Sequence, residues 1–393
     1  MPSITLTKDQ TSALENIIAW QKKPHKQFLT LGGYAGTGKT TLLSIFRSKL
    51  FSMYPKLKVG FCAFTGKASQ VLQKSLKQER AVFKGDKVGT IHSLIYQAIT
   101  DNKGVICGWE KRTSLPFDLL IVDEASMVSE VIWKDLLSFA VPIIAVGDHG
   151  QLTPIEDKFS LMKQPDITLE KIHRQAEGSP IIKLSQVVRE VGYIPVGRIA
   201  STVVKHSRVD SDIHSITQSL LESWDEESLF LVGMNATRIQ LNQQVRSLRD
   251  YYSLDPATGD RVICLKNNWQ VGIYNGMLGT ILHLESDFDR AKTHQWFKAT
   301  IQMDDGSVYS GKISRHQFNS AASVREVKGL KYAEIGDLFD FGYALTVHKA
   351  QGSQARRVIV FEQRNKYMSD EEWRRWLYTA VTRAEEELII IGD

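Results

Sequence analysis

The chain has 393 residues, of which 42% are hydrophobic and 24% charged, with a formal net charge of +5 at pH 7. These values are typical of a soluble globular protein of roughly two to three domains, and the mildly basic balance permits a nucleic-acid partner without demonstrating one. The sequence shows no apolar run long enough to span a bilayer and no signal-peptide segment at its start, which argues against a membrane protein. Three scattered cysteines, Cys62, Cys107 and Cys264, argue against a disulfide framework and a zinc site.

The first apolar segment, 28–31, is followed by a glycine-rich loop and a helical pattern, in the letters GGYAGTGKTT. The loop fits G-x-x-x-x-G-K-[ST], in which backbone N–H groups and a helix N-terminus hold the phosphates of a nucleoside triphosphate. Lys39 would reach the β- and γ-phosphates, and the Thr40 hydroxyl would bind Mg²⁺. We therefore predict a nucleotide site formed by Gly33, Gly36, Thr37, Gly38, Lys39, Thr40 and Thr41.

Further apolar segments at 58–64, 118–122 and 142–146 alternate with helical patterns, as in a parallel sheet covered by helices. Such sheets bind ligands beyond the carboxyl ends of their strands, so the motifs that follow these segments should converge.

An acidic pair and a glutamine follow two of these segments. Asp123 would hold Mg²⁺, Glu124 would orient or deprotonate the attacking water, and Gln151 would sense the γ-phosphate or position that water. Two arginines from elsewhere in the chain would stabilise charge in the transition state. The catalytic candidates are Lys39, Asp123, Glu124, Gln151, Arg174 and Arg383, and the metal-ligand candidates are Thr40 and Asp123.

The pattern predicts an α/β protein with two further features. A segment of about 95–116 reads as a hairpin that projects from the first domain, and the strand-rich segment 259–335, with Asn-Gly and Asp-Asp-Gly turns, reads as a small antiparallel barrel. Helical and strand patterns resume after it. The predicted domains are 1–165 and a second made of 166–258 and 336–393, with the barrel inserted in the second.

Eight segments form an ordered set along the chain: GYAGTGKTT, AFTGKAS, GTIHSLI, IVDEAS, GDHGQLTPI, HRQ, TVHKAQGSQ and YTAVTRA. This set resembles that of superfamily 1 helicases, and most closely the RecD-like and Dda-like group of superfamily 1B. The resemblance extends from Gln10 to Asp393. It implies two RecA-like P-loop motor domains, with a β-hairpin in the first and an SH3-like barrel inserted in the second.

The resemblance also implies roles for individual residues. Gln10 would contact the adenine, Gly352 and Gln354 would face the ribose and phosphates, and Arg174 and Arg383 would be arginine fingers. The single strand would be contacted by Thr65, Lys67, His92, Asn235, Thr237, Thr346, His348 and Lys349.

Three aromatic residues are candidates for stacking on bases or separating strands. They are Trp109 on the hairpin and Trp269 or Tyr274 near the barrel, although each is open to the alternative that it is simply packed in a core.

The function implied by the resemblance is an ATP-dependent DNA helicase that moves 5′ to 3′ on single-stranded DNA and unwinds duplex, with ATP and Mg²⁺ as cofactors. We expect a monomeric motor in the cytoplasm of a bacterium or a phage-infected cell, acting in DNA replication, repair or recombination. Its partners would be single-stranded DNA, single-strand/duplex junctions, and single-strand-binding or replication proteins. Two alternatives remain open at this point: an RNA-directed or annealing translocase, and a nucleic-acid-stimulated regulatory NTPase that does not unwind.

Overall fold

The computed structural model describes residues 6–100, 106–153, 159–171, 178–268, 270–288, 293–331 and 334–393, and for 98, 100 and 106–109 it describes the backbone alone. The chain divides into two compact units, Met1–Ile182 and Lys183–Asp393, and the boundary falls within the first turn of α7.

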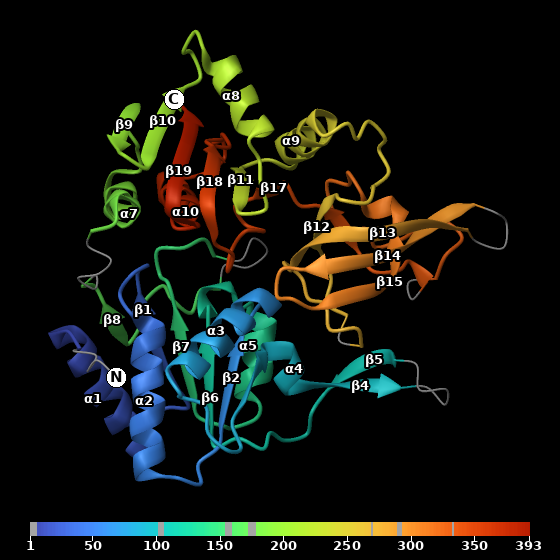
Figure 1. The fold of residues 1–393 in the computed structure, drawn as a ribbon. Coiled ribbons are helices and arrows are strands. Elements are labelled where there is room, and N and C mark those ends of the chain that lie inside the picture. The colour runs from blue at the N-terminus through green and yellow to red at the C-terminus, as the bar shows by residue number, and fades with distance from the viewer. Residues whose placement is uncertain are drawn as a thin grey trace. The chain divides into compact units, whose positions relative to one another are not determined.

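A six-stranded parallel sheet forms the centre of the first unit, in the order β3-β2-β6-β7-β1-β8 (Figure 1). Its strands are β1 (Phe28–Gly33), β2 (Val59–Ala63), β3 (Lys87–Thr90), β6 (Leu119–Asp123), β7 (Ile143–Gly147) and β8 (Ile167–Leu169). Among its described residues, the helices are α1 (Lys8–Lys22), α2 (Lys39–Met53), α3 (Gly66–Gln78), α4 (Ile91–Ile95), α5 (Glu130–Leu137) and the 3-10 turn η1 (Ala125–Met127). The short strand β8 pairs with β1 in this sheet, whereas we predicted that residues from 166 onward belong to the second domain.

The strands of the first sheet are buried on both faces. In β6, Leu119 and Ile121 pack in one hydrophobic cluster with α1, α2 and α3, whereas Leu120 and Val122 pack in a second cluster with α4 and α5. Successive side chains of a strand point to opposite faces, so a strand covered on both sides needs an unbroken apolar run. The four consecutive apolar residues LLIV, at 119–122, meet this requirement.

A separate two-stranded hairpin follows α4. It consists of β4 (Tyr96–Thr100) and β5 (Ile106–Lys111), which pair antiparallel within the segment where the sequence predicts a hairpin. Its loop, 101–105, lies outside the described residues.

The second unit contains another six-stranded sheet, in the order β17-β11-β18-β19-β10-β9, which is parallel apart from the edge strand β9. Its strands are β9 (Gly197–Ala200), β10 (Val203–Ser207), β11 (Ser228–Val232), β17 (Ala344–Thr346), β18 (Ala355–Phe361) and β19 (Ala384–Gly392). Its helices are α7 (Pro180–Val191), α8 (Ile213–Glu222), α9 (Asn235–Leu248) and α10 (Asp370–Val381).

A five-stranded antiparallel sheet is inserted between α9 and β17, in the order β15-β14-β13-β12-β16. It consists of β12 (Arg261–Cys264), β13 (Leu278–Phe288), β14 (His294–Met303), β15 (Val308–Ser314) and β16 (Phe339–Phe341), with the 3-10 turn η2 (Arg315–Gln317) after β15. Strand β16 lies beyond 335, where we predicted that the inserted segment ends. A bridge between Ile313 and Asp337 links β15 to the residues just before β16, so the two edges of the sheet are joined at one point.

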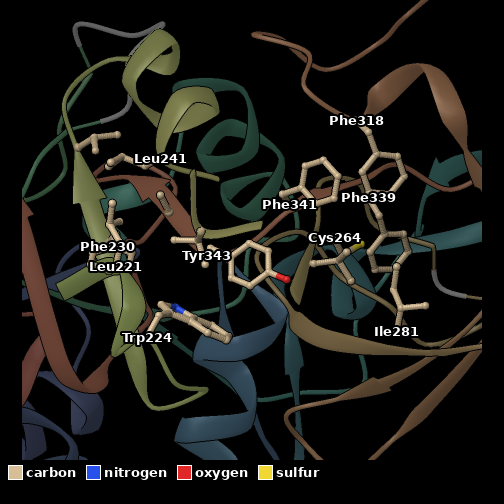
Figure 2. Packing of buried hydrophobic residues seen from close by; sticks show 14 of the residues in the cluster. Leu221, Trp224, Phe230, Leu241, Cys264, Ile281, Phe318, Phe339, Phe341 and Tyr343 are labelled. Atoms are coloured by element: carbon tan, nitrogen blue, oxygen red, sulfur yellow. The ribbon is translucent and has the colours of Figure 1, made fainter. Parts of the chain in front are cut away.

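The inserted sheet and the second parallel sheet share one hydrophobic core, part of which Figure 2 shows. Phe230 and Leu241, from β11 and α9, belong to the same buried cluster as Ile281 and Phe339 of the inserted sheet. Trp224 and Tyr343 meet edge to face in this cluster, with ring centroids 4.7 Å apart. The inserted segment is therefore not a separately packed domain.

Candidate nucleotide and strand-binding sites

The predicted P-loop lies between β1 and α2, at the carboxyl end of β1. Gly38 precedes the helix with φ +75°, a left-handed conformation that favours glycine. The Lys39 ammonium donates hydrogen bonds to the carbonyl oxygens of Gly33 at 2.7 Å and Tyr34 at 3.0 Å. The lysine is thus held against the loop whose N–H groups are suited to phosphate oxygens.

Gln10 packs directly on this loop and is only 1% exposed. Its Oε1 accepts the N–H of Thr7 in the capping box of α1, and its Nε2 donates to the carbonyl of Thr37 at 2.9 Å. A Cβ on Gly38 would lie 2.5 Å from Gln10 Nε2, so glycine at 38 also permits this close approach. The structure therefore shows Gln10 as a link between α1 and the P-loop, and its contact with adenine stays a prediction.

The predicted acidic pair lies at the carboxyl end of β6. Asp123 Oδ1 accepts the N–H of Glu124 at 2.9 Å, and Glu124 has a left-handed φ of +50°, which is uncommon for a residue with a side chain. Burial raises the pKa of Asp123, whereas the Glu124 amide and the charge of Lys39 lower it. Asp123 is partly buried, and its carboxylate is a hard oxygen ligand of the kind that Mg²⁺ prefers.

Gln151 lies in the loop after β7, where Asp148 organises the turn. Asp148 is buried, and its carboxylate accepts the Gly150 N–H at 2.9 Å and the Gln151 side-chain amide at 3.3 Å. This loop also contacts the P-loop, because the rings of His149 and Tyr34 lie 3.9 Å apart. This contact is not apparent from the sequence, since neither residue belongs to the signature positions of its motif.

The predicted strand-contacting residues of the first unit follow β2 and β3. Thr65 is the N-cap of α3, where its hydroxyl accepts the Ala68 N–H, and Lys67 lies in the first turn of that helix. His92 lies in α4, and burial lowers its pKa, so the imidazole is neutral near pH 7.

The two groups of motifs occupy different parts of the sheet edge. In the order β3-β2-β6-β7-β1-β8, the strand-contacting candidates follow β3 and β2, whereas the nucleotide candidates follow β6, β7 and β1. Parallel strands present all their carboxyl ends at one edge, so both groups lie on the same side of the unit.

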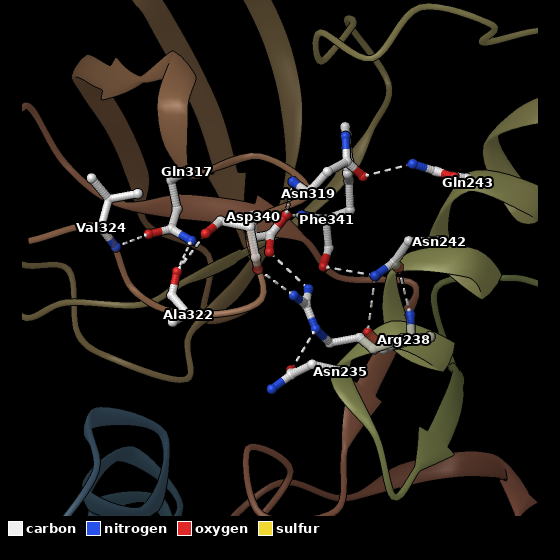
Figure 3. A network of polar contacts seen from close by, with 12 residues as sticks. Asn235, Arg238, Asn242, Gln243, Gln317, Asn319, Ala322, Val324, Asp340 and Phe341 are labelled. Atoms are coloured by element: carbon white, nitrogen blue, oxygen red, sulfur yellow. Dashed lines mark hydrogen bonds and ion pairs between the residues drawn. The ribbon is translucent and has the colours of Figure 1, made fainter. Parts of the chain in front are cut away.

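In the second unit, α9 begins at Asn235, which belongs to an extensive polar network (Figure 3), and Thr237 lies in the first turn of the same helix. Arg238, 1% exposed, donates to Asn235 Oδ1 at 3.1 Å, to Asp340 Oδ2 at 2.7 Å and to the carbonyl of Ser320 at 2.7 Å. Arg238 therefore connects a predicted strand-contacting residue to the segment that ends the inserted sheet. Arg238 was not among the predicted site residues, although it lies one helical turn after Asn235.

Gln363, which follows β18, is a second missed residue. Its Oε1 accepts the N–H groups of Gly233 and Met234, and its Nε2 donates to the Thr237 hydroxyl at 2.7 Å. No local signal marks it, because its partners lie about 130 positions away along the chain.

Thr346 is the last residue of β17, which lies next to β11 in the sheet, and His348 and Lys349 follow that strand. The Thr346 hydroxyl accepts the N–H of Lys349 at 3.4 Å. Burial lowers the pKa of His348, and burial together with the charge of Arg238 lowers the pKa of Lys349 to about 8, which Asp340 partly offsets.

Arg383 and the predicted ribose-facing segment lie together. The guanidinium of Arg383, 4% exposed, donates to the carbonyls of Thr379 and Ser353 and to the Thr382 hydroxyl, at 3.0 to 3.1 Å. Ser353 lies between Gly352, which has φ +73°, and Gln354. The structure therefore brings Arg383, Gly352 and Gln354 into one local site of the second unit.

Four predicted residues belong neither to the nucleotide candidates nor to the strand-contacting candidates that the structure describes. Arg174 and Trp269 lie outside the described residues, and Trp109 belongs to β5 but its side chain is not described. Tyr274 is half-buried and packs against the shared core, as expected for a packed aromatic. In the described part of the chain, no helix is both long and apolar enough to cross a membrane.

Known proteins resemble this chain in sequence and in fold. Residues 5–211, more than half of the chain, match the family model described as AAA domain, and residues 341–391 match the UvrD-like helicase C-terminal domain. A crystal structure of Pif1 helicase from Bacteroides in complex with ADP-AlF3 and ssDNA is similar with a TM-score of 0.57 and 20% identity, covering 99% of this chain and 92% of that one. A structure of forked duplex unwinding by two coordinating Pif1 helicases has a TM-score of 0.56 and 21% identity, with the same coverage.

Curated relatives include the ATP-dependent RecD2 DNA helicase of Deinococcus radiodurans, 26% identical over 99% of this chain, and the RecBCD enzyme subunit RecD of Mycobacterium tuberculosis, 24% identical over 92%. The chain corresponds to 49% of the length of the first relative and 66% of the second.

A glycine loop at the start of α2, an acidic pair at the end of β6 and two parallel sheets with the fold of Pif1 helicase define a P-loop protein with two RecA-like domains. The chain belongs to the AAA domain family. It is similar in sequence to RecD2 and RecD helicases and in fold to Pif1 helicase.

Proposed function

We propose that the chain is an ATP-driven DNA helicase that moves 5′ to 3′ along single-stranded DNA and separates duplex ahead of it. The observation that carries this proposal is the division of the first sheet edge, where strand-contacting candidates follow β3 and β2 and nucleotide candidates follow β6, β7 and β1. Both sites are then supported by one sheet, so binding or hydrolysis of ATP is able to change the affinity for the single strand.

At the nucleotide, Lys39 would hold the β- and γ-phosphates and Glu124 would orient or deprotonate the attacking water. Gln151, held by Asp148, would sense the γ-phosphate. Arg383 and Arg174 are the proposed arginine fingers, Gln10 the adenine contact, and Gly352 and Gln354 the contacts to ribose and phosphates. The resemblance supports these roles residue by residue.

The donor set suits Mg²⁺. Asp123 and Thr40 offer hard oxygen ligands, and Mg²⁺ in such sites takes few protein ligands because substrate phosphates complete its shell. Among the described residues no cluster of three or more His, Cys, Asp or Glu could hold a metal by itself, which fits such a shared site. When bound, the ion would neutralise charge on the transferring phosphoryl group.

On the strand, hydroxyls and a few cations would contact the backbone, as sequence-independent tracking requires. Thr65, Lys67 and His92 would do so in the first unit. In the second unit the candidates are Asn235, Thr237, Thr346, His348 and Lys349. We further propose that the hairpin of β4 and β5, with Trp109, separates the strands, and that the inserted sheet with its joined edges is an SH3-like barrel.

The binding of single strands is expected to weaken as the pH rises from about 7 to about 9. Lys349, with a pKa of about 8, is charged below that pH and neutral above it, so a phosphate contact is lost on the alkaline side. Since burial lowers the pKa values of His92 and His348, both are already neutral in this range and do not contribute to the change. The loss should be roughly tenfold in affinity, measured by fluorescence anisotropy with a labelled oligonucleotide at constant ionic strength.

The control is Lys349→Arg, in which the charge persists over the whole pH range. This variant should bind with a nearly flat pH profile. If it shows the same alkaline loss as the wild type, Lys349 is not the titrating contact.

The proposed function itself is tested with duplexes that carry either a 5′ or a 3′ single-stranded tail, in DNA and in RNA. Unwinding from the 5′ DNA tail in the presence of ATP and Mg²⁺ is the expected result. Unwinding only from 3′ tails would overturn the direction, and a preference for RNA tails would favour the RNA-directed translocase. Strand-stimulated ATP hydrolysis with no unwinding from either tail would favour the regulatory NTPase.

A further inference from the structure

One carboxylate ties together both strands of the β4–β5 hairpin at its root. Tyr96, the first residue of β4, and Lys111, the last of β5, are register partners. The Tyr96 hydroxyl donates to Asp135 Oδ2 at 2.5 Å, and the Lys111 ammonium contacts Asp135 Oδ1 at 3.3 Å. Lys111 also donates to the Ser138 hydroxyl at 2.9 Å, and that hydroxyl donates to the carbonyl of Asp135.

The ring of Tyr96 also contacts a predicted strand-contacting residue, His92. The rings of His92 and Tyr96 are stacked, with centroids 5.4 Å apart and planes 30° apart. Tyr96 also caps α4, because its N–H bonds the carbonyl of His92. His92 and the hairpin root are therefore coupled through the backbone and through the rings.

Asp135 lies on a helix that is firmly built into the first unit. Its neighbours on α5, Trp133 and Leu136, are buried in the hydrophobic cluster that covers one face of the sheet. Just before the hairpin, Leu94 and Ile95 are buried in the same cluster. The chain thus leaves the core at Tyr96, and the contact with Asp135 lies at the point about which the hairpin would pivot.

The contact is chemically durable. Burial and the Asp135 carboxylate raise the pKa of Tyr96, so the hydroxyl keeps its proton and donates at any working pH. A two-stranded hairpin is at best marginally stable by itself, so its direction depends on how its root is attached.

We propose that Tyr96 and Asp135 are positioning residues for strand separation. They fix the hairpin on α5 beside His92, so that the hairpin keeps its orientation while the single strand is translocated. This inference rests on the proposed function. A hairpin with a loosened root would still allow ATP hydrolysis and movement along a single strand. It would oppose the duplex less effectively, because part of each advance would turn the hairpin instead of opening a base pair.

The test is Tyr96→Phe, which removes only the hydroxyl. Single-turnover unwinding of a 5′-tailed duplex should slow by roughly tenfold, the factor that corresponds to one charge-assisted hydrogen bond of ordinary strength. The maximal rate of ATP hydrolysis with a single-stranded oligonucleotide, and its apparent KM for that oligonucleotide, should stay within about twofold of wild type. Asp135→Ala should show the same separation of the two activities with a larger loss of unwinding.

The matched control is Tyr252→Phe, since Tyr252 is exposed and donates to Asp250 at 2.9 Å in the second unit. It should leave all activities unchanged. In a double-mutant cycle, Tyr96→Phe should cost little further unwinding when Asp135 is already alanine.

The outcomes separate the inference from the proposed function. Equal unwinding by wild type and Tyr96→Phe would overturn the inference alone. A parallel fall of unwinding, ATP hydrolysis and thermal midpoint would assign Tyr96 a purely structural role and also overturn it. If the wild type hydrolyses ATP but unwinds nothing, the proposed function fails and the inference fails with it.

Discussion

Lys39→Ala is expected to lower strand-stimulated ATP turnover by roughly 10²- to 10³-fold, the range typical for loss of one preorganised group that stabilises transition-state charge. The Lys39 ammonium lies against the P-loop, bonded to the carbonyls of Gly33 and Tyr34, and its charge already acts on Asp123. No other described P-loop residue carries a positive charge, so alanine would leave the β- and γ-phosphates without their cation. Steady-state hydrolysis at saturating oligonucleotide and ATP measures the effect.

The matched control is Lys49→Ala on the same helix, where the side chain is exposed. It should leave turnover unchanged. Full activity of Lys39→Ala would show that the glycine loop is not the site of hydrolysis and would remove the basis of the proposed function.

Glu124→Gln is expected to lower ATP turnover by about 100-fold or more while ATP and single strands still bind. The substitution keeps the shape of the side chain and removes the carboxylate that would orient or deprotonate the attacking water. Glu124 adopts a left-handed backbone conformation between β6 and η1, and uncommon conformations of this kind are frequent at functional sites. Turnover by steady-state assay, together with dissociation constants for ATP and oligonucleotide, separates chemistry from binding.

Glu130→Gln on α5 is the control, because Glu130 forms a partly exposed ion pair with Lys134 and lies outside the predicted site. It should behave as wild type. If Glu124→Gln instead weakens ATP binding in proportion to turnover, the residue contributes to nucleotide affinity and another group is the base.

Local patterns predicted much of the fold, and the candidate site residues stay predictions, whose places in that fold are now known for the described part of the chain. The four apolar segments of the first unit are strands because a parallel sheet covered on both sides requires unbroken apolar runs, and the loops that follow them carry the polar motifs. Thr65 is a helix cap, as a threonine before a helical pattern favours.

Features built from distant partners could not be predicted in this way. Strands β8 and β16 have three residues each, too few for a period to show, and so the limits at 166 and 335 were placed wrongly. Gln363 and Arg238 act through partners roughly 80 to 130 positions away, which no local pattern records. The resemblance predicts that Gln10 contacts a ligand. It does not indicate that the Gln10 amide also donates a hydrogen bond to the P-loop carbonyl of Thr37.

The common core of the inserted sheet and the second parallel sheet limits how the inserted segment can change in evolution. Phe230 of β11 and Phe339 of β16 lie in the same buried cluster, so excising the insertion would strip cover from aromatic rings on both sides of the cut. The inserted sheet therefore cannot be shortened or replaced without exposing part of this core. A substitution in the core on one sheet requires a compensating substitution on the other, so we expect core residues of the two sheets to change together in evolution.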